Sequence, residues 1–257
     1  MRNFRSLDAD KVIETIAALQ RRIAERFPNA GLRGVCGELL TIARESSQRA
    51  QAIGRTNTPL RLLVFAFLVG SLWVLAWILS LIDFTRTGAD SVYSVLQGIE
   101  AAANLTVLMG AALFFLFRIE ERVKRRRALR ALHELRSIVH VIDMHQLTKD
   151  PSGSVSIGGS TLSSPSRTLT RFELSRYLDY SSEMLSLTAK VAVLYAQSFP
   201  DTEVTEAVSD IERIAAGLSQ KIWQKIMILQ SAGIEATRTL TPAATTPPLA
   251  APSHAAG

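Results

Sequence analysis

The segment that decides the fold of this chain is IEAAANLTVLMGAALFFLFRIEERVKRRR, residues 99–127. After its opening Ile-Glu pair it continues as an uncharged, mostly apolar run from Ala101 to Phe117, and it ends in a basic cluster. As a helix this run is about 25 Å long, which approaches the roughly 30 Å hydrocarbon core of a bilayer. Glu100 and Arg118 would mark its two ends, so the segment is predicted to cross a membrane.

A second uncharged run lies earlier in the chain, from Leu62 to Ile82. Its helical length of about 31 Å exceeds that of an ordinary core helix and matches a bilayer. Between the two runs Arg86 is the only basic residue, whereas basic residues are frequent on their outer flanks. The positive-inside rule therefore predicts that both termini lie in the cytoplasm, with the plasma (inner) membrane of a bacterium as the expected location. The N-terminus has no continuous apolar stretch, so no cleavable signal peptide is expected.

The flanking regions show helical periodicity, with apolar residues spaced three or four apart. The predicted seams are Val12, Ile16, Leu19, Ile23 and Phe27; Val35, Leu39, Ile42, Ser46, Ala50 and Ile53; Leu132, Leu135, Val139 and Ile142; Leu174, Tyr177, Ser181, Met184, Thr188, Val191 and Tyr195; and Val208, Ile211, Ala215, Leu218, Ile222 and Leu229. Thr170 and Glu173 have the spacing of a capping box. Each apolar stripe needs a partner, which an antiparallel bundle would supply.

The predicted fold class is an all-α integral membrane protein, in which a two-span transmembrane hairpin carries an antiparallel cytoplasmic helical bundle formed by the N- and C-terminal flanks. The predicted segments are a cytoplasmic helical hairpin (1–58), a first span (59–82), a short extracytoplasmic loop (83–98), a second span (99–118), a helix continuing into the cytoplasm (119–147), a flexible Ser/Gly loop (148–169), a second helical hairpin (170–235) and a disordered tail (236–257). No internal repeat is present.

The basic cluster after the second span is predicted to face the anionic head groups of the membrane. Its members are Arg122, Lys124, Arg125, Arg126, Arg127 and Arg130. The net charge of +6 would also suit a nucleic-acid binder. However, the cluster has no interleaved aromatic residues to stack on bases, so nucleic acid is not expected as a partner.

The spans contain two features that bear on assembly. Small residues recur every four positions and would let helices approach closely: Gly98, Ala102, Thr106 and Gly110 in the second span, with Ala66 and Gly70 in the first. Asn104 lies roughly opposite Ala102 and Thr106 on its helix. An intramembrane amide is a functional-site candidate by default, although a simple interhelical hydrogen bond would also explain it.

The sequence offers little for catalysis. His133 and His140 are about 10 Å apart along a helix, too far to share one ion, so no metal and no cofactor are expected. His140 and Asp143 could pair locally. Cys36 is the only cysteine and has no apparent catalytic partner, which favours a small buried residue. Trp223 is interpreted as bundle core or an interface patch.

We therefore expect a non-enzymatic, membrane-anchored helical bundle that forms a homo-oligomer and binds a cytoplasmic protein partner. The alternative is an oligomeric two-span channel or pore in which Asn104 faces the conduit. The topology resembles two-span divalent-cation channels and two-span bacterial pore-forming effectors in shape alone. The Gly-Met-Asn signature of magnesium channels and the Asp-Ile-Met-Glu signature of calcium uniporters are both missing, so no function follows from that likeness.

Overall fold

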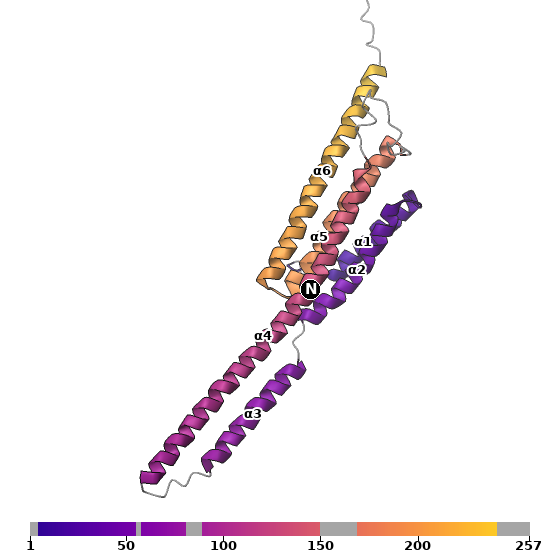
Figure 1. The fold of residues 1–257 in the computed structure, drawn as a ribbon. Helices are drawn as coiled ribbons and strands as arrows, with labels where there is room; N and C mark the ends of the chain where they lie inside the picture. The colour runs from indigo at the N-terminus through magenta and orange to yellow at the C-terminus, as the bar shows by residue number, and fades with distance from the viewer. Residues whose placement is uncertain (1–4, 55–57, 81–88, 150–168, 241–257) are drawn as a thin grey trace, which may run out of the picture.

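The computed structural model describes residues 5–54, 58–80, 89–149 and 169–240 of the 257-residue chain (Figure 1). These residues form six α-helices and no strand: α1 (Ala9–Arg26), α2 (Gly31–Gly54), α3 (Thr58–Ser80), α4 (Ala89–Leu147), α5 (Arg171–Ser198) and α6 (Thr202–Leu240). The prediction of an all-α fold is thus confirmed for the part of the chain that the structure describes.

Four helical segments pack around α5 and form a five-helix bundle with it. This helix packs against α1, α2, α4 and α6, and the C-terminal half of α4 also contacts α2 and α6 (Figure 1). Helices α1 and α2 pack as one hairpin, and α5 and α6 pack as another. The start of the described chain is tied to the end of α5, because the Leu7 N–H donates to Gln197 Oε1 at 3.0 Å. The central helix therefore holds both hairpins and α4 together.

Side-chain caps set the beginnings of three bundle helices. Asp8 accepts hydrogen bonds from the backbone N–H groups of Asp10 and Lys11 at the start of α1. Thr170 and Glu173 form the predicted capping box at the start of α5, and that prediction is confirmed. Asp201 accepts from the N–H groups of Glu203 and Val204 at the start of α6. Each cap satisfies backbone donors that the first helical turn leaves without an intrahelical partner.

The predicted seams form the core of the bundle. Nearly all of their members are buried, and only Ile42, Leu174 and Leu218 are partly exposed. The buried seam includes two polar side chains of α5, Ser181 and Thr188. Their hydroxyls donate to the carbonyls of Tyr177 and Met184 one turn earlier, so they are hydrogen-bonded within their own helix. Trp223 has an exposed fraction of 56%, so it does not belong to the core.

Charged contacts between helices lie at the rim of this core. Arg22 of α1 makes a bidentate contact with Glu183 of α5, with its shorter N–O distance at 2.6 Å. Arg49 of α2 pairs with Glu134 of α4 at 2.8 Å. Their side chains are 40–46% exposed, so each pair contributes about 0.2–1 kcal/mol. Their contribution to the free energy of unfolding of the bundle is therefore small.

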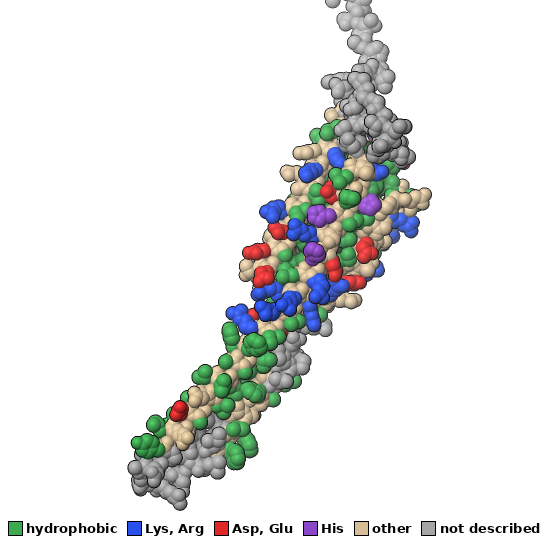
Figure 2. All heavy atoms as spheres, viewed as in Figure 1, with side chains coloured by type: hydrophobic (Ala, Val, Ile, Leu, Met, Phe, Trp, Pro, Cys, Tyr) green, Lys and Arg blue, Asp and Glu red, His purple; other side chains and the backbone are tan. Residues whose placement is uncertain are grey.

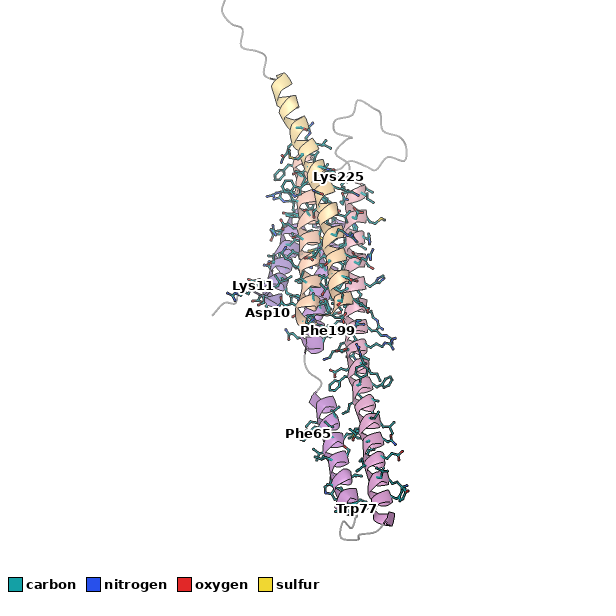
Figure 3. The ribbon with its side chains drawn as sticks, turned by 90° about the vertical axis from the view of Figure 1, so that its left-hand side faces the viewer. Asp10, Lys11, Phe65, Trp77, Phe199 and Lys225 are labelled. Carbon is teal, nitrogen blue, oxygen red and sulfur yellow. The ribbon has the colours of Figure 1, made fainter. Side chains whose placement is uncertain are left out.

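Helix α3 and the N-terminal half of α4 extend beyond the bundle as a separate hairpin (Figures 1 and 3). Within the described residues one helix, Leu96–Leu147, is long and apolar enough to cross a membrane, and none of its apolar window is buried. The apolar part found in α3 is shorter, Val64–Val74. Of the two predicted spans, only the second is therefore long and apolar enough, within the described residues, to cross a membrane. Residues 81–82 of the first predicted span lie outside the described residues.

Two predicted boundaries differ from the structure. Helix α4 begins at Ala89, so most of the extracytoplasmic loop expected over residues 83–98 is helical. The Ser and Gly content of that stretch lowers helix propensity, but continuity with the following helix outweighs it. Helix α6 ends at Leu240, whereas the second helical hairpin was predicted to end at residue 235. Residues 150–168 of the predicted Ser/Gly loop (148–169) and residues 241–257 of the predicted tail (236–257) lie outside the described residues.

Candidate functional site

The candidate site is the junction where α4 passes from the projecting hairpin into the bundle. Helix α4 has 59 residues and is continuous across this junction, as predicted from the seam that follows the second span. Figure 2 shows hydrophobic side chains over the visible face of the hairpin and a dense group of Lys and Arg side chains where it meets the bundle. Phe114, Phe115 and Phe117 are exposed on the hairpin side, and Ala128 is the first fully buried residue on the bundle side.

Two members of the basic cluster form ion pairs with carboxylates of the chain itself. The Lys124 Nζ lies 2.8 Å from a carboxylate oxygen of Glu120, one turn earlier on α4, and both side chains are mostly buried. Arg125 reaches α6, where its guanidinium contacts Asp201 Oδ2 at 2.6 Å and Glu203 Oε1 at 2.8 Å. Of the six basic residues predicted to face lipid, Lys124 and Arg125 are thus already paired with carboxylates of the chain itself.

Asp201 serves two purposes at this junction. Its Oδ1 caps α6, and its Oδ2 accepts from the Arg125 Nε at 2.9 Å and Nη2 at 2.6 Å. Desolvation opposes ionisation of this carboxyl. The hydrogen bonds from Arg125 and from the N–H groups of Val204 and Glu203 outweigh it, so the pKa of Asp201 lies below its ordinary value. Asp201 thus joins the beginning of α6 to the point where α4 enters the bundle.

Replacing Asp201 by Asn is expected to lower the free energy of unfolding by about 1 kcal/mol at neutral pH, because Asn keeps the cap but loses the charged pair with Arg125. Asp201→Ala should cost about 0.5–2 kcal/mol more, because the cap is lost as well. A carboxyl with a lowered folded-state pKa stabilises the fold above its unfolded pKa of about 3.9, and that contribution disappears as the pH falls through the folded-state pKa.

Chemical unfolding followed by circular dichroism at pH 7 and near pH 3 tests this prediction. The gap between the wild type and Asp201→Asn should narrow at the lower pH. A gap that stays constant over this range would show that the charge on Asp201 does not contribute.

The other four members of the cluster, Arg122, Arg126, Arg127 and Arg130, are exposed. Within the described residues none of them forms an ion pair. Arg118, at the apolar edge, lies over the Phe114 ring at 5.3 Å and 3.8 Å from Glu121. The cluster therefore has two parts. Lys124 and Arg125 form ion pairs within the chain, and the four exposed arginines are available to an external anion.

The small-residue rows of the hairpin do not meet at their glycines. A Cβ built on Gly70 or on Gly110 would find nothing within 4 Å, and Ala66 is exposed. Beside Ala102 and Thr106 lies an apolar space of about 310 Å³ lined on the α3 side by Leu68, Val69, Ser71 and Leu72. The expected pairing of the two rows is therefore not made at Ala66, Gly70 or Gly110; across the apolar space, Ala102 and Thr106 are faced by larger α3 residues such as Leu68 and Leu72.

Asn104 is exposed and does not line the space between α3 and α4. The serine and threonine hydroxyls of this region bond within their own helices: Ser80 donates to the Trp77 carbonyl at 2.7 Å and Thr106 to the Ala102 carbonyl at 2.8 Å. Ser80 therefore has its hydrogen-bond partner in α3. Because Ala102 and Thr106 line the space beside α3, Asn104, two residues from each, lies on the opposite side of the helix.

The described residues do not form a metal-binding group of three or more His, Cys, Asp or Glu side chains. His133 and His140 are exposed on α4. Asp143 accepts a hydrogen bond from Gln146 Nε2 at 2.6 Å, so its local partner is Gln146 and not His140. His145 lies against Gly31 at the far end of the bundle, where a Cβ would meet its ring at 2.5 Å. Burial raises the pKa of the Cys36 thiol to about 12, so it is protonated at neutral pH and is a poor nucleophile.

The sequence predicted the position of the basic cluster. It did not predict that Arg125 is paired with carboxylates of the chain itself while four other arginines are exposed. Asp201 lies 76 residues from Arg125, and no local pattern links them. The one available signal was the residue type: Asp201 lies between the last two predicted seams, and Asp favours the N-cap position of a helix. No protein-family model, curated protein or solved structure matches this chain.

Proposed function

We propose that this protein is a non-enzymatic, membrane-anchored scaffold whose hairpin lies in the bilayer, self-associates there, and holds the helical bundle at the cytoplasmic surface for a protein partner. The observation that carries this proposal is α4: a single helix with an uncovered apolar half, a basic junction and a half that is packed in the bundle core. Apolar surface on this scale is costly in water and is covered by lipid in a bilayer.

The distribution of aromatic and basic residues supports this orientation. Trp77 lies near the end of the hairpin farthest from the bundle (Figure 3), stacked on Trp73 with ring centroids 6.5 Å apart. Tyr93, near the start of α4, is 75% exposed. Tryptophan and tyrosine favour the membrane–water interface, and arginine favours the cytoplasmic side. The hairpin thus carries Trp77 and Tyr93 toward one end and guanidinium groups at the other.

Fractionation and reporter fusions test the anchoring. The full chain expressed in bacteria should stay in the membrane pellet after alkaline carbonate extraction. A phosphatase reporter fused after Gly88 should be active outside the cytoplasm, and one fused after Gly233 should be inactive. Release by carbonate would exclude insertion, and activity at Gly233 would exclude the cytoplasmic assignment of the bundle.

The self-association part of the proposal rests on Asn104. Its amide is exposed and faces away from α3, and leaving it in hydrocarbon is costly. A second subunit can supply a matching amide about a twofold or higher symmetry axis. We expect a homo-oligomer in mild detergent whose association weakens by about 0.6–2 kcal/mol on Asn104→Leu, whereas Ser80→Ala has little effect. Light scattering that finds a wild-type monomer, or an oligomer indifferent to Asn104→Leu, would contradict it.

A pore is the second candidate, and the same exposed amide favours it. In an oligomer Asn104 could line a water-filled path instead of a contact between subunits. Planar-bilayer recordings distinguish the two functions: a scaffold passes no current, whereas a pore conducts, and Asn104→Leu would reduce that conductance.

A further inference from the structure

The junction contains a hollow of about 340 Å³ on the surface of α4. Its described lining is Phe115, Arg118, Ile119, Glu121, Arg122 and Arg125. On a helix, positions 115, 118, 119 and 122 are separated by three or four residues and share one face. Along α4 this face carries Phe115, Arg118, Ile119 and Arg122 in that order, so apolar and guanidinium side chains alternate on it within two turns.

Among the residues that the structure describes, one guanidinium of the hollow, that of Arg122, has no ion-pair partner. Arg125 is bound by Asp201 and Glu203, and Arg118 has Glu121 at 3.8 Å, a long contact between exposed side chains. Arg122 is exposed and forms no ion pair with any residue that the structure describes. Arg126, one turn further on, is likewise exposed and unpaired among those residues. Arg122 and Arg118 therefore line the hollow one turn apart on α4, and Arg126 follows one turn beyond Arg122.

We propose that this hollow binds the phosphate group of an anionic phospholipid, with Arg122 and Arg118 as its ligands and with Phe115 and Ile119 against the upper acyl chain. Guanidinium groups bind phosphate oxygens through paired N–H donors. Each of the two arginines has an apolar residue three positions earlier on α4, that is, toward the hairpin: Phe115 before Arg118 and Ile119 before Arg122. The inference rests on the proposed anchoring of the hairpin in a bilayer. It goes further because it assigns lipid binding to one face of the basic cluster and excludes Lys124 and Arg125 from it.

The choice of a lipid over a soluble phosphate comes from the mixed lining. Phe115 is 65% exposed and Ile119 is 43% exposed beside the guanidinium groups. A free phosphate or glycerol phosphate would leave this apolar surface uncovered, whereas a phospholipid covers it while its phosphate reaches Arg122. Glu121 also lines the hollow and disfavours an anion at that edge, so the phosphate is placed on the Arg122 side.

The test titrates the full chain in phosphatidylcholine nanodiscs with short-chain phosphatidylglycerol and measures bound lipid. Removing one arginine from the site is expected to weaken binding about fivefold, so Arg122→Gln should show this loss and Arg118→Gln/Arg122→Gln a loss of about 25-fold. The matched control is Arg127→Gln, which removes the same charge from an exposed position on a different face of α4. Its effect should be less than twofold.

Further measurements distinguish a phospholipid site from diffuse charge attraction and from a soluble-phosphate site. Short-chain phosphatidylcholine should bind weakly, and glycerol phosphate should compete poorly, since it lacks acyl chains. An equal loss in Arg127→Gln would show diffuse attraction and overturn the site, and strong competition by glycerol phosphate would make it a soluble-phosphate site. Circular dichroism confirms that each variant is folded. Failure of the chain to insert into phosphatidylcholine vesicles would refute the anchoring itself, whereas insertion without phosphatidylglycerol preference would refute this inference alone.

Discussion

Replacing Leu185 by Ala is expected to lower the free energy of unfolding of the bundle by about 2–5 kcal/mol. Leu185 is fully buried on α5, the helix that contacts α1, α2, α4 and the partner of its own hairpin, α6. Truncating it leaves a cavity where several helices meet, and neighbouring helices held by separate hairpins have limited freedom to close it. Chemical unfolding of the full chain in detergent, followed by circular dichroism, measures the loss.

The adjacent residue provides the control. Ser186 is exposed on the same turn of α5, so Ser186→Ala should change the unfolding free energy by less than about 0.5 kcal/mol. A loss below about 1 kcal/mol in Leu185→Ala would mean that the site collapses without a cavity, and α5 would then not be the central packing element.

Replacing Val123 by Pro is expected to uncouple the hairpin from the bundle. Val123 is 41% exposed and lies on α4 between Phe117, on the hairpin side, and Ala128, where the core begins. Proline removes the N–H that bonds to the carbonyl of Ile119 and clashes with that carbonyl, which costs about 3 kcal/mol and kinks or breaks a helix. Both flanking halves of α4 should persist, since the bundle half keeps its buried seam.

Spin labels at exposed positions 108 and 133 report this change. In the wild type they are separated by about 38 Å along a continuous helix and should give a narrow distance distribution. Val123→Pro should broaden and shorten it, and Val123→Ala should leave it unchanged. A narrow, unshifted distribution in the proline variant would show that α4 is held straight by contacts other than its own hydrogen bonds.

The parts of the fold that could be predicted from the sequence depend on short-range patterns. Three- and four-residue spacings place Leu135 and Val139 on one face whatever the rest of the chain does, and the Thr170–Glu173 spacing specifies a cap locally. The continuity of α4 was predictable for the same reason, because the seam after Arg130 follows the apolar run without Gly or Pro between them.

What could not be predicted depends on contacts between distant segments. The role of Arg125 is set by Asp201, and only the packing of α6 against α4 brings the two together. The small residues of the hairpin are a case in which a local pattern did not lead to the expected contact. Gly70 and Gly110 permit a close approach but do not enforce one, and whether helices meet there depends on the larger side chains around them. The start of α4 at Ala89 reflects helix propagation, which composition alone does not reveal.

If the hairpin is anchored in a bilayer as proposed, the unbroken α4 connects the bundle rigidly to the membrane, so that the bundle pivots about the level of the head groups. From Arg118 to Leu147 the helix rises about 44 Å, so a change of about ten degrees in its tilt would move Leu147 sideways by about 8 Å. The tilt of a membrane helix responds to bilayer thickness, since a helix changes its angle to match its apolar length to the hydrocarbon core. In an anchored chain, thinning or thickening of the membrane would thus be converted into a lateral swing of the bundle's far end, large enough to make or break contact with a neighbouring protein.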